Sequence, residues 1–144
     1  MTDNPIDGFF LKKEDFKFIG EGLQRPECIL AEKDGTLWSA DARGGVVRID
    51  ANGNQTVITQ SHSAEAFQSS DDDAQKFVDG TLPNGLAFAS NGDILISNFG
   101  TDCLERMTRT GDTTVMFDSV NGEPIGKVNF VCRDSKNRIW ITIS

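Results

Sequence analysis

The sequence of 144 residues predicts an all-β fold. After residue 20, short apolar runs bounded by Gly, Asn and Asp follow one another, as strands joined by tight turns do. The pairs Asp34-Gly35, Asn52-Gly53 and Asn91-Gly92 are hairpin signals. The pattern of strand, turn and strand also recurs along the chain, which indicates an architecture built from repeats.

The repeat is visible by direct alignment. PECILAEKDGTLWSAD (26–41) aligns without gaps with PNGLAFASNGDILISN (83–98) at an offset of 57 residues. VNFVCRDSKNRIWITI (128–143) follows at a further offset of 45 residues. Gly35 and Gly92 share a column in which Asn137 takes the third place, and a residue that tolerates positive φ is expected there.

Further strand pairs follow the first two units, at 45–50 with 56–59 and at 103–108 with 113–118. Four short strands per unit, repeated every 45–57 residues, are typical of a β-propeller blade. We therefore predict an N-terminal segment over 1–20, then a partial β-propeller over 21–144 of about two and a half blades. The blades are placed at about 21–60, 80–120 and 126–144, the last one incomplete.

A propeller needs at least four blades to close its ring, so the chain is expected to be part of a longer sequence. A self-standing β-sandwich or open sheet is the alternative. The polar segment 60–80 is expected to form a long loop. Trp38 and Trp140 are expected to pack between blades, and the three cysteines to be buried free thiols. Four phenylalanines of the N-terminal segment could pack on the main body as a short strand or helical turn: Phe9, Phe10, Phe16 and Phe18.

Charge and hydropathy narrow the function classes. A net charge of −8 repels nucleic acid phosphates, and the sequence has no basic stripe to offset it. No apolar run approaches the roughly 18 residues of a membrane span, and the N-terminus lacks the order of a secretory signal peptide. We expect no nucleic acid partner, no membrane association and a cytoplasmic location.

One column of the repeat carries oxygen ligands. Glu27, Asn84 and Asn129 occupy it, directly after Pro26, Pro83 and Val128. If this column begins the strands nearest the propeller axis, the three side chains converge at one mouth of the central channel. A carboxylate with amide carbonyls suits Ca²⁺ or Mg²⁺. The alternative is that these residues only cap turns before strands.

The first repeat, RPECILAEKDGTLWSADARGGVVRIDANG, resembles the opening blade of the SMP-30/gluconolactonase/LRE-like family. LPNGLAFASNGDILISNFGTDCLERM and GKVNFVCRDSKNRIWIT resemble its NGL and PND-type segments, so the resemblance covers residues 20–144. It implies a six-bladed propeller of about twice this length with one divalent cation in the channel. Ca²⁺ is the first choice, with Mg²⁺ or Zn²⁺ as alternatives. Cys28 and Phe130 depart from the family pattern.

By this resemblance Glu27 and Asn129 match metal-ligand positions, and Asn84 matches a channel position that contacts either substrate or a water on the metal. The implied activity is metal-dependent hydrolysis of a lactone, with a small-molecule lactone or sugar acid as the substrate. The general base, an Asp, is expected beyond Ser144, so the site in this chain is incomplete. A non-catalytic propeller scaffold that binds a ligand is the alternative, because fold alone does not decide function. The oligomeric state is left open.

Overall fold

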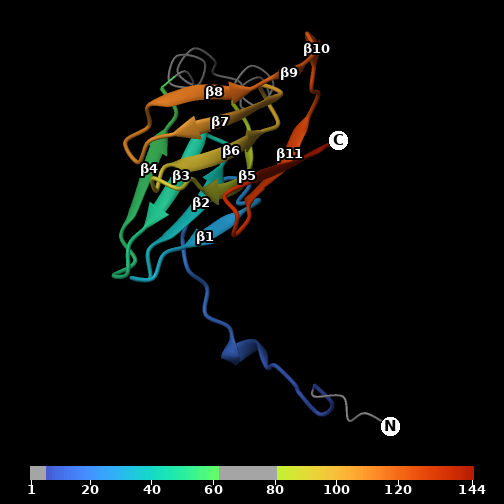
Figure 1. The fold of residues 1–144 in the computed structure, drawn as a ribbon. Coiled ribbons are helices and arrows are strands. Elements are labelled where there is room, and N and C mark those ends of the chain that lie inside the picture. Colours follow the sequence, from blue (N-terminus) through green and yellow to red (C-terminus); the bar gives the residue numbers. More distant parts are fainter. Residues whose placement is uncertain (1–5, 62–80) are drawn as a thin grey trace.

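The computed structural model describes residues 6–61 and 81–144, which form antiparallel β-sheets (Figure 1). The first sheet has four strands, β1 (Ile29–Ala31), β2 (Leu37–Asp41), β3 (Gly45–Ile49) and β4 (Gln55–Thr59). The second has β5 (Pro83–Phe88), β6 (Ile94–Asn98), β7 (Cys103–Met107) and β8 (Thr113–Phe117). Two hairpins follow, β9 (Ser119–Val120) with β10 (Glu123–Pro124) and β11 (Val128–Arg133) with β12 (Ile139–Ile143). The loop predicted over 60–80 lies almost entirely outside the described residues.

Five hairpin turns share one hydrogen-bond pattern. In each, the first residue's N–H donates to the carbonyl of the fifth, and the fourth residue's N–H donates back to the carbonyl of the first. The fourth residue always has positive φ: Gly35, Gly53, Gly92, Gly111 and, in the third unit, Asn137 at 62°. The prediction that Asn137 replaces the turn glycine is therefore confirmed.

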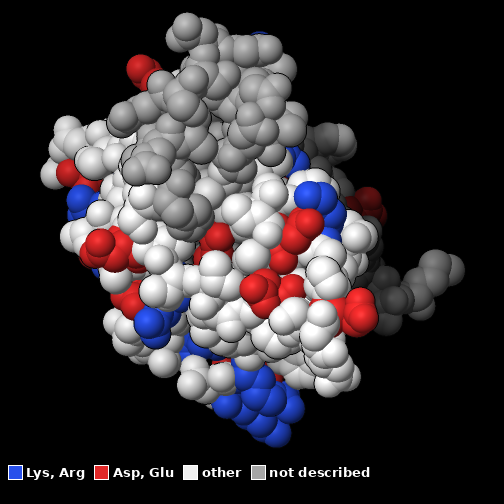
Figure 2. Space-filling view, turned by 90° about the horizontal axis from the view of Figure 1, so that it is seen from above, with Lys and Arg blue, Asp and Glu red and all other residues white. Residues whose placement is uncertain are grey.

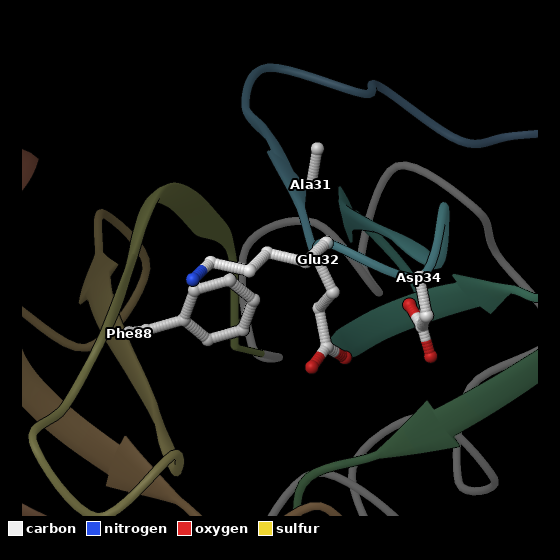
Figure 3. Close-up of a pocket in the computed structure, with 5 residues that line it drawn as sticks. Ala31, Glu32, Asp34 and Phe88 are labelled. Atoms are coloured by element: carbon white, nitrogen blue, oxygen red, sulfur yellow. The ribbon is translucent and has the colours of Figure 1, made fainter.

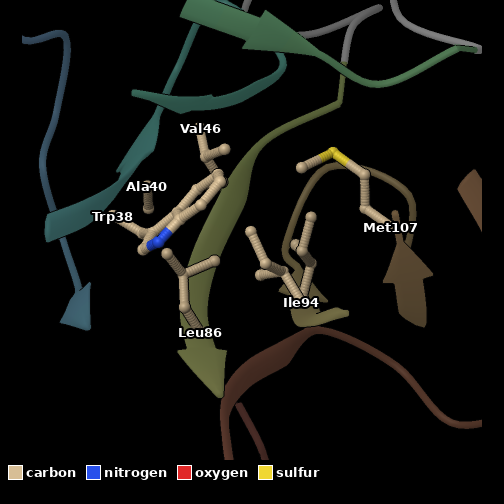
Figure 4. Close-up of a cluster of buried hydrophobic side chains, with 7 residues drawn as sticks. Trp38, Ala40, Val46, Leu86, Ile94 and Met107 are labelled. Atoms are coloured by element: carbon tan, nitrogen blue, oxygen red, sulfur yellow. The ribbon is translucent and has the colours of Figure 1, made fainter. Parts of the chain in front are cut away.

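The core lies between successive sheets (Figure 4). Trp38 and Ala40 of the first sheet pack against Leu86, Ile94 and other apolar residues of the second. A second cluster joins the second sheet to the β11–β12 hairpin, and its members are Ala87, Leu95, Leu104 and Val131. Because strand side chains alternate between faces, the second sheet uses one face for each contact. Its inner strands β5 and β6 consequently bury apolar side chains on both sides.

The three sheets are also held at equivalent points of the repeat. Ala42 N–H donates to Gln24 O, Phe99 N–H to Leu82 O, and Ser144 N–H to Lys127 O. Each bond ties the end of the second strand to the segment that precedes the first strand. The first strands β1, β5 and β11 lie next to one another in this order. One end of the three strands therefore carries the column predicted to bear oxygen ligands.

Within the N-terminal segment, residues 6–19 run away from the sheets and contain one short 3-10 turn, η1 (Lys13–Asp15) (Figure 1). Its four phenylalanines are 54–90% exposed. The expectation that they pack on the main body is therefore wrong. Cys132 and Trp140 are exposed as well, so the predictions that they are buried are wrong. Both residues lie on the face of the β11–β12 hairpin that is turned away from the second sheet. Cys28 and Cys103 are half-buried. Among the described residues, no helix is long and apolar enough to cross a bilayer.

Candidate functional site

Two residues of the predicted column are in direct contact. Asn84 and Asn129 are the second residues of β5 and β11, the neighbouring first strands. Asn84 Nδ2 donates to the backbone oxygen of Asn129 at 2.8 Å and to its Oδ1 at 2.5 Å. Asn84 is only 8% exposed, and its own Oδ1 has no hydrogen-bond partner. An unsatisfied buried oxygen costs about 1–3 kcal/mol, so this oxygen is a candidate to accept a hydrogen bond or to bind a cation.

Glu27 precedes β1 and occupies the same place in the first sheet as the asparagines do in theirs. Its side chain is 43% exposed, and Oε1 accepts a hydrogen bond from Arg25 Nε at 2.8 Å. Arg25 itself adopts a positive φ of 50°, which turns the chain immediately before Glu27. The structure thus pairs the carboxylate with Arg25 and pairs the two asparagines with each other.

Two hydroxyl groups orient Asn129. Ser97 Oγ donates to the backbone oxygen of Asn129 at 2.9 Å and accepts the Gly85 N–H at 2.7 Å, so it joins β11 to the second sheet. Ser144 Oγ accepts from Asn129 Nδ2 at 2.9 Å. Sequence reasoning missed Ser97. The available signal was a hydroxyl residue within the apolar run Ile94–Ser97.

A second polar column also went unnoticed in the alignment. Asp41 and Asn98 end β2 and β6 at the same repeat position, and both accept backbone N–H groups of the adjoining loops. Burial tends to raise the pKa of Asp41. The hydrogen bonds from Arg43 and from the Gln24 amide outweigh burial and lower that pKa overall. This column fixes the loops around the candidate site.

The buried carboxylate of Glu105 forms a hydrogen-bond network next to Asn98, at the same end of the sheets. Glu105, 1% exposed, accepts hydrogen bonds from Gln60 Nε2 at 2.6 Å, Asn98 Nδ2 at 2.8 Å and Thr101 Oγ1 at 3.0 Å. Gln60 follows the first sheet while the other three belong to the second. The network therefore locks the two sheets together, and paired buried polar groups of this kind favour one arrangement.

The opposite end of the first strands carries a concave surface lined by Ala31, Glu32, Lys33, Asp34 and Phe88 (Figure 3). The Glu32 carboxylate accepts hydrogen bonds from Arg109 at 2.6 Å and from Trp38 Nε1 at 2.7 Å. Both bonds, that of Arg109 foremost, lower the pKa of Glu32. Glu32 is thus engaged in holding the sheets. Seen from above, acidic and basic groups are interspersed over the molecule (Figure 2).

No protein-family profile and no curated protein matches the chain. Solved structures do match. A catalytically inactive virginiamycin B lyase from Staphylococcus aureus, solved with quinupristin, superposes with a TM-score of 0.59 and 18% identity over 86% of this chain. A gluconolactonase from Xanthomonas campestris gives a TM-score of 0.57 and 16% identity over 76%. The chain has a β-propeller fold.

A structural-genomics target described as a gluconolactonase candidate is similar too, with a TM-score of 0.57 and 22% identity over 88% of this chain. The chain spans 36%, 31% and 44% of the length of these three neighbours. At such identities the likeness is one of fold. The fold class predicted from the repeats, an all-β partial propeller, is therefore confirmed.

Proposed function

We propose that this chain contributes to a divalent-metal-dependent hydrolase site for lactones, with Glu27 and Asn129 as cation ligands and Asn84 lining the channel. The observation that carries the proposal is the buried Oδ1 of Asn84, which has no hydrogen-bond partner. It lies beside Asn129, and both residues stand in the repeat column that Glu27 begins. The gluconolactonase neighbours support the same class of substrate at the level of fold.

The donor set favours a hard cation. Amide oxygens and a carboxylate are ligands of Ca²⁺ and Mg²⁺, whereas Zn²⁺ prefers nitrogen and sulfur. Within residues 6–61 and 81–144, no group of three or more His, Cys, Asp or Glu could hold a metal. A cation at this mouth would depend on the amide oxygens together with Glu27, and Ca²⁺ is the cation we propose.

In the described part of the chain, the neighbouring residues orient the proposed ligand Asn129. Asn84 and Ser144 hold the Asn129 side chain through their hydrogen bonds, and Ser97 holds its backbone. When bound, the cation would supply Lewis-acid polarisation of a lactone carbonyl. An Asp general base is not among the residues of this column. Glu27, Asn84 and Asn129 offer three oxygens where Ca²⁺ takes six to eight, so hydrolysis needs further residues at the same mouth.

Calcium titration of the full-length protein by calorimetry, with Glu27→Gln as the test variant, examines the proposal. Glu21→Gln is the matched control, because it removes an equal charge from the same exposed segment six residues earlier. We expect Glu27→Gln to weaken calcium binding at least tenfold and Glu21→Gln to leave it unchanged. Equal weakening by both variants would mean that the loss of calcium affinity comes from the change in net charge and not from a lost ligand. Absence of binding by the unmodified full-length protein would favour a non-catalytic scaffold.

Lactone hydrolysis is the second measurement. Turnover that depends on added calcium and is lost in Glu27→Gln would support the hydrolase. Calcium binding with no turnover on any sugar-acid lactone would support the proposed metal site and contradict the proposed hydrolase activity.

A further inference from the structure

The sequence contains four Asn-Gly pairs, and the structure gives them different surroundings. They are Asn52-Gly53, Asn84-Gly85, Asn91-Gly92 and Asn121-Gly122. In such a pair the backbone nitrogen of the glycine can attack the side-chain amide carbon of the asparagine, because no Cβ on the glycine obstructs the approach. The attack needs a backbone nitrogen and a side chain that other hydrogen bonds do not hold. The hydrogen bonds of the four pairs therefore indicate which of them can react.

The pair Asn84-Gly85 is held at both reacting groups. The Gly85 N–H donates to Ser97 Oγ at 2.7 Å, and Asn84 Nδ2 donates to the backbone oxygen of Asn129 at 2.8 Å. Both residues of the pair are buried in β5. This pair cannot react unless the contact between the second sheet and β11 opens first.

The pair Asn91-Gly92 lies in the turn between β5 and β6 and is held there in a similar way. The Gly92 N–H donates to Ala89 O at 3.0 Å. Asn91 Nδ2 donates to Asp93 Oδ2 at 2.8 Å, and Asn91 Oδ1 accepts the Asp93 N–H at 3.2 Å. The attacking nitrogen and the amide that it would attack are therefore both engaged.

The pair Asn52-Gly53 lies in the turn between β3 and β4, and Asp50 organises that turn. The Gly53 N–H donates to Asp50 O at 2.9 Å. Asp50 Oδ1 accepts the N–H groups of Asn52 and Asn54, each at 2.9 Å. Although the Asn52 side chain is exposed, the attacking nitrogen is engaged, and both flanking strands belong to a four-stranded sheet.

The pair Asn121-Gly122 differs at both reacting groups. It forms the two-residue turn between β9 and β10, with φ of 52° at Asn121 and 85° at Gly122. Positive φ at both central residues is typical of a type I′ hairpin turn. Within residues 6–61 and 81–144, the Gly122 N–H has no acceptor and the Asn121 side chain has no hydrogen-bond partner. Both residues are exposed, and a Cβ on Gly122 would have no atom within 4 Å.

The hairpin that carries this turn is also short. β9 and β10 form a separate two-stranded sheet with two residue pairs, and one of these includes Pro124, which has no N–H to donate. The strand residues Ser119, Val120, Glu123 and Pro124 are all exposed. A segment with few buried contacts opens at a low free-energy cost. The turn can therefore reach the geometry for attack more often than the turns of the four-stranded sheets.

We propose that Asn121 is the site at which this protein undergoes spontaneous succinimide formation and deamidation. The Gly122 nitrogen loses its proton and forms a bond to Asn121 Cγ, the bond from Cγ to Nδ2 breaks, and Nδ2 leaves as ammonia with that proton. Water then opens the succinimide ring. Opening at Cγ gives aspartate, and opening at the main-chain carbonyl carbon gives isoaspartate, in which the chain continues through the former side chain. This inference does not depend on the proposed function.

Both products change the tip of the β9–β10 hairpin. A carboxylate replaces a neutral amide, so the net charge becomes more negative than −8 by one. Gly122 lines a concave surface together with Asp102 and Asp118, so the new charge joins acidic side chains, and like charges repel. Isoaspartate also lengthens the backbone of a turn whose length sets the strand register. Deamidation should therefore loosen this hairpin and leave the four-stranded sheets intact.

Peptide mapping by mass spectrometry tests the assignment on the full-length protein, incubated at mildly alkaline pH because the attacking nitrogen must lose its proton. We expect aspartate and isoaspartate to accumulate at Asn121 about tenfold faster than at Asn52, Asn84 or Asn91. Asn121→Asp should abolish the fast phase of ammonia release. Asn52→Asp is the matched control in another exposed turn and should leave that phase unchanged. Faster reaction at any of the other three asparagines would overturn the proposal.

The same measurement in guanidinium chloride separates the effect of the structure from that of the neighbouring sequence. In the unfolded chain none of the four pairs keeps its native hydrogen bonds. The lead of Asn121 should therefore disappear, and Asn84 should gain the most in rate. An undiminished lead of Asn121 in the unfolded chain would mean that the neighbouring residues select the site, and this would overturn the structural inference.

Discussion

Trp38 and Trp140 occupy the same place in the repeat and have opposite surroundings. Each donates its indole N–H to an acidic residue six positions earlier. Trp38 has the second sheet and Arg109 over its ring, while Arg138 of the same hairpin lies over the Trp140 ring and no sheet of the described residues covers it. The strand and turn geometry around both is therefore local. The burial of each ring is not a local property, because it depends on whether a neighbouring sheet packs against that face.

The comparison predicts its largest effect for truncation of the two rings. Trp38→Ala removes a buried ring from the main cluster and should lower the free energy of unfolding by about 3–5 kcal/mol. Trp140→Ala should change the free energy of unfolding by less than about 1 kcal/mol, because the Trp140 ring is half exposed. Urea unfolding of both variants measures the difference. Similar losses for the two variants would mean that the Trp140 ring is buried as the Trp38 ring is.

Gly85→Ala should act on the contact between the second sheet and the β11–β12 hairpin. A Cβ at this position would lie 2.8 Å from Phe130 Cα and 2.8 Å from Ser97 Oγ, so backbone must move. We expect a loss of about 1–3 kcal/mol, as for overpacked cores. Hydrogen exchange should quicken in β11 and β12 and stay slow in β2 and β3. Equal quickening in both regions would contradict a local effect.

The smallest expected effect concerns the carboxylates beneath the two rings. Hydrogen bonds from Arg109 and Trp38 lower the pKa of Glu32 below its ordinary 4.5. A lowered folded-state pKa adds stability that is complete above pH 4.5 and is lost as the pH falls through the folded value. Glu32→Gln should cost about 0.2–1 kcal/mol at pH 7 and make unfolding less sensitive to acid.

Asp134 is the matched comparison for this pH effect. The Arg138 amide foremost, and the Trp140 indole, lower its pKa to about 2. Its contribution should persist to lower pH, being complete above 3.8 and lost toward pH 2. Asp134→Asn should leave the pH dependence between pH 4 and 5 as in the unmodified chain. Thermal unfolding from pH 7 to pH 3 measures both variants, and identical profiles would remove the distinction.

Part of the candidate site could be predicted from the alignment alone. Asn84 and Asn129 share a column, and the structure joins them by hydrogen bonds. The pairing of Glu27 with Arg25 could not be predicted, because it depends on the positive φ of Arg25. Ser97 was missed since its partner Asn129 is 32 residues away and its own strand is apolar. Whether the column holds a cation stays a prediction.

The sequence by itself determined the local units. Turn glycines, Asn137 and the period of the apolar runs dictate hairpins, because φ preferences and strand alternation act over a few residues. Only the tertiary structure decided which faces are covered. Trp38 is buried and Trp140 exposed, although their neighbours in the chain follow the same pattern. Burial requires a second surface, and no pattern within a strand specifies whether that surface is present.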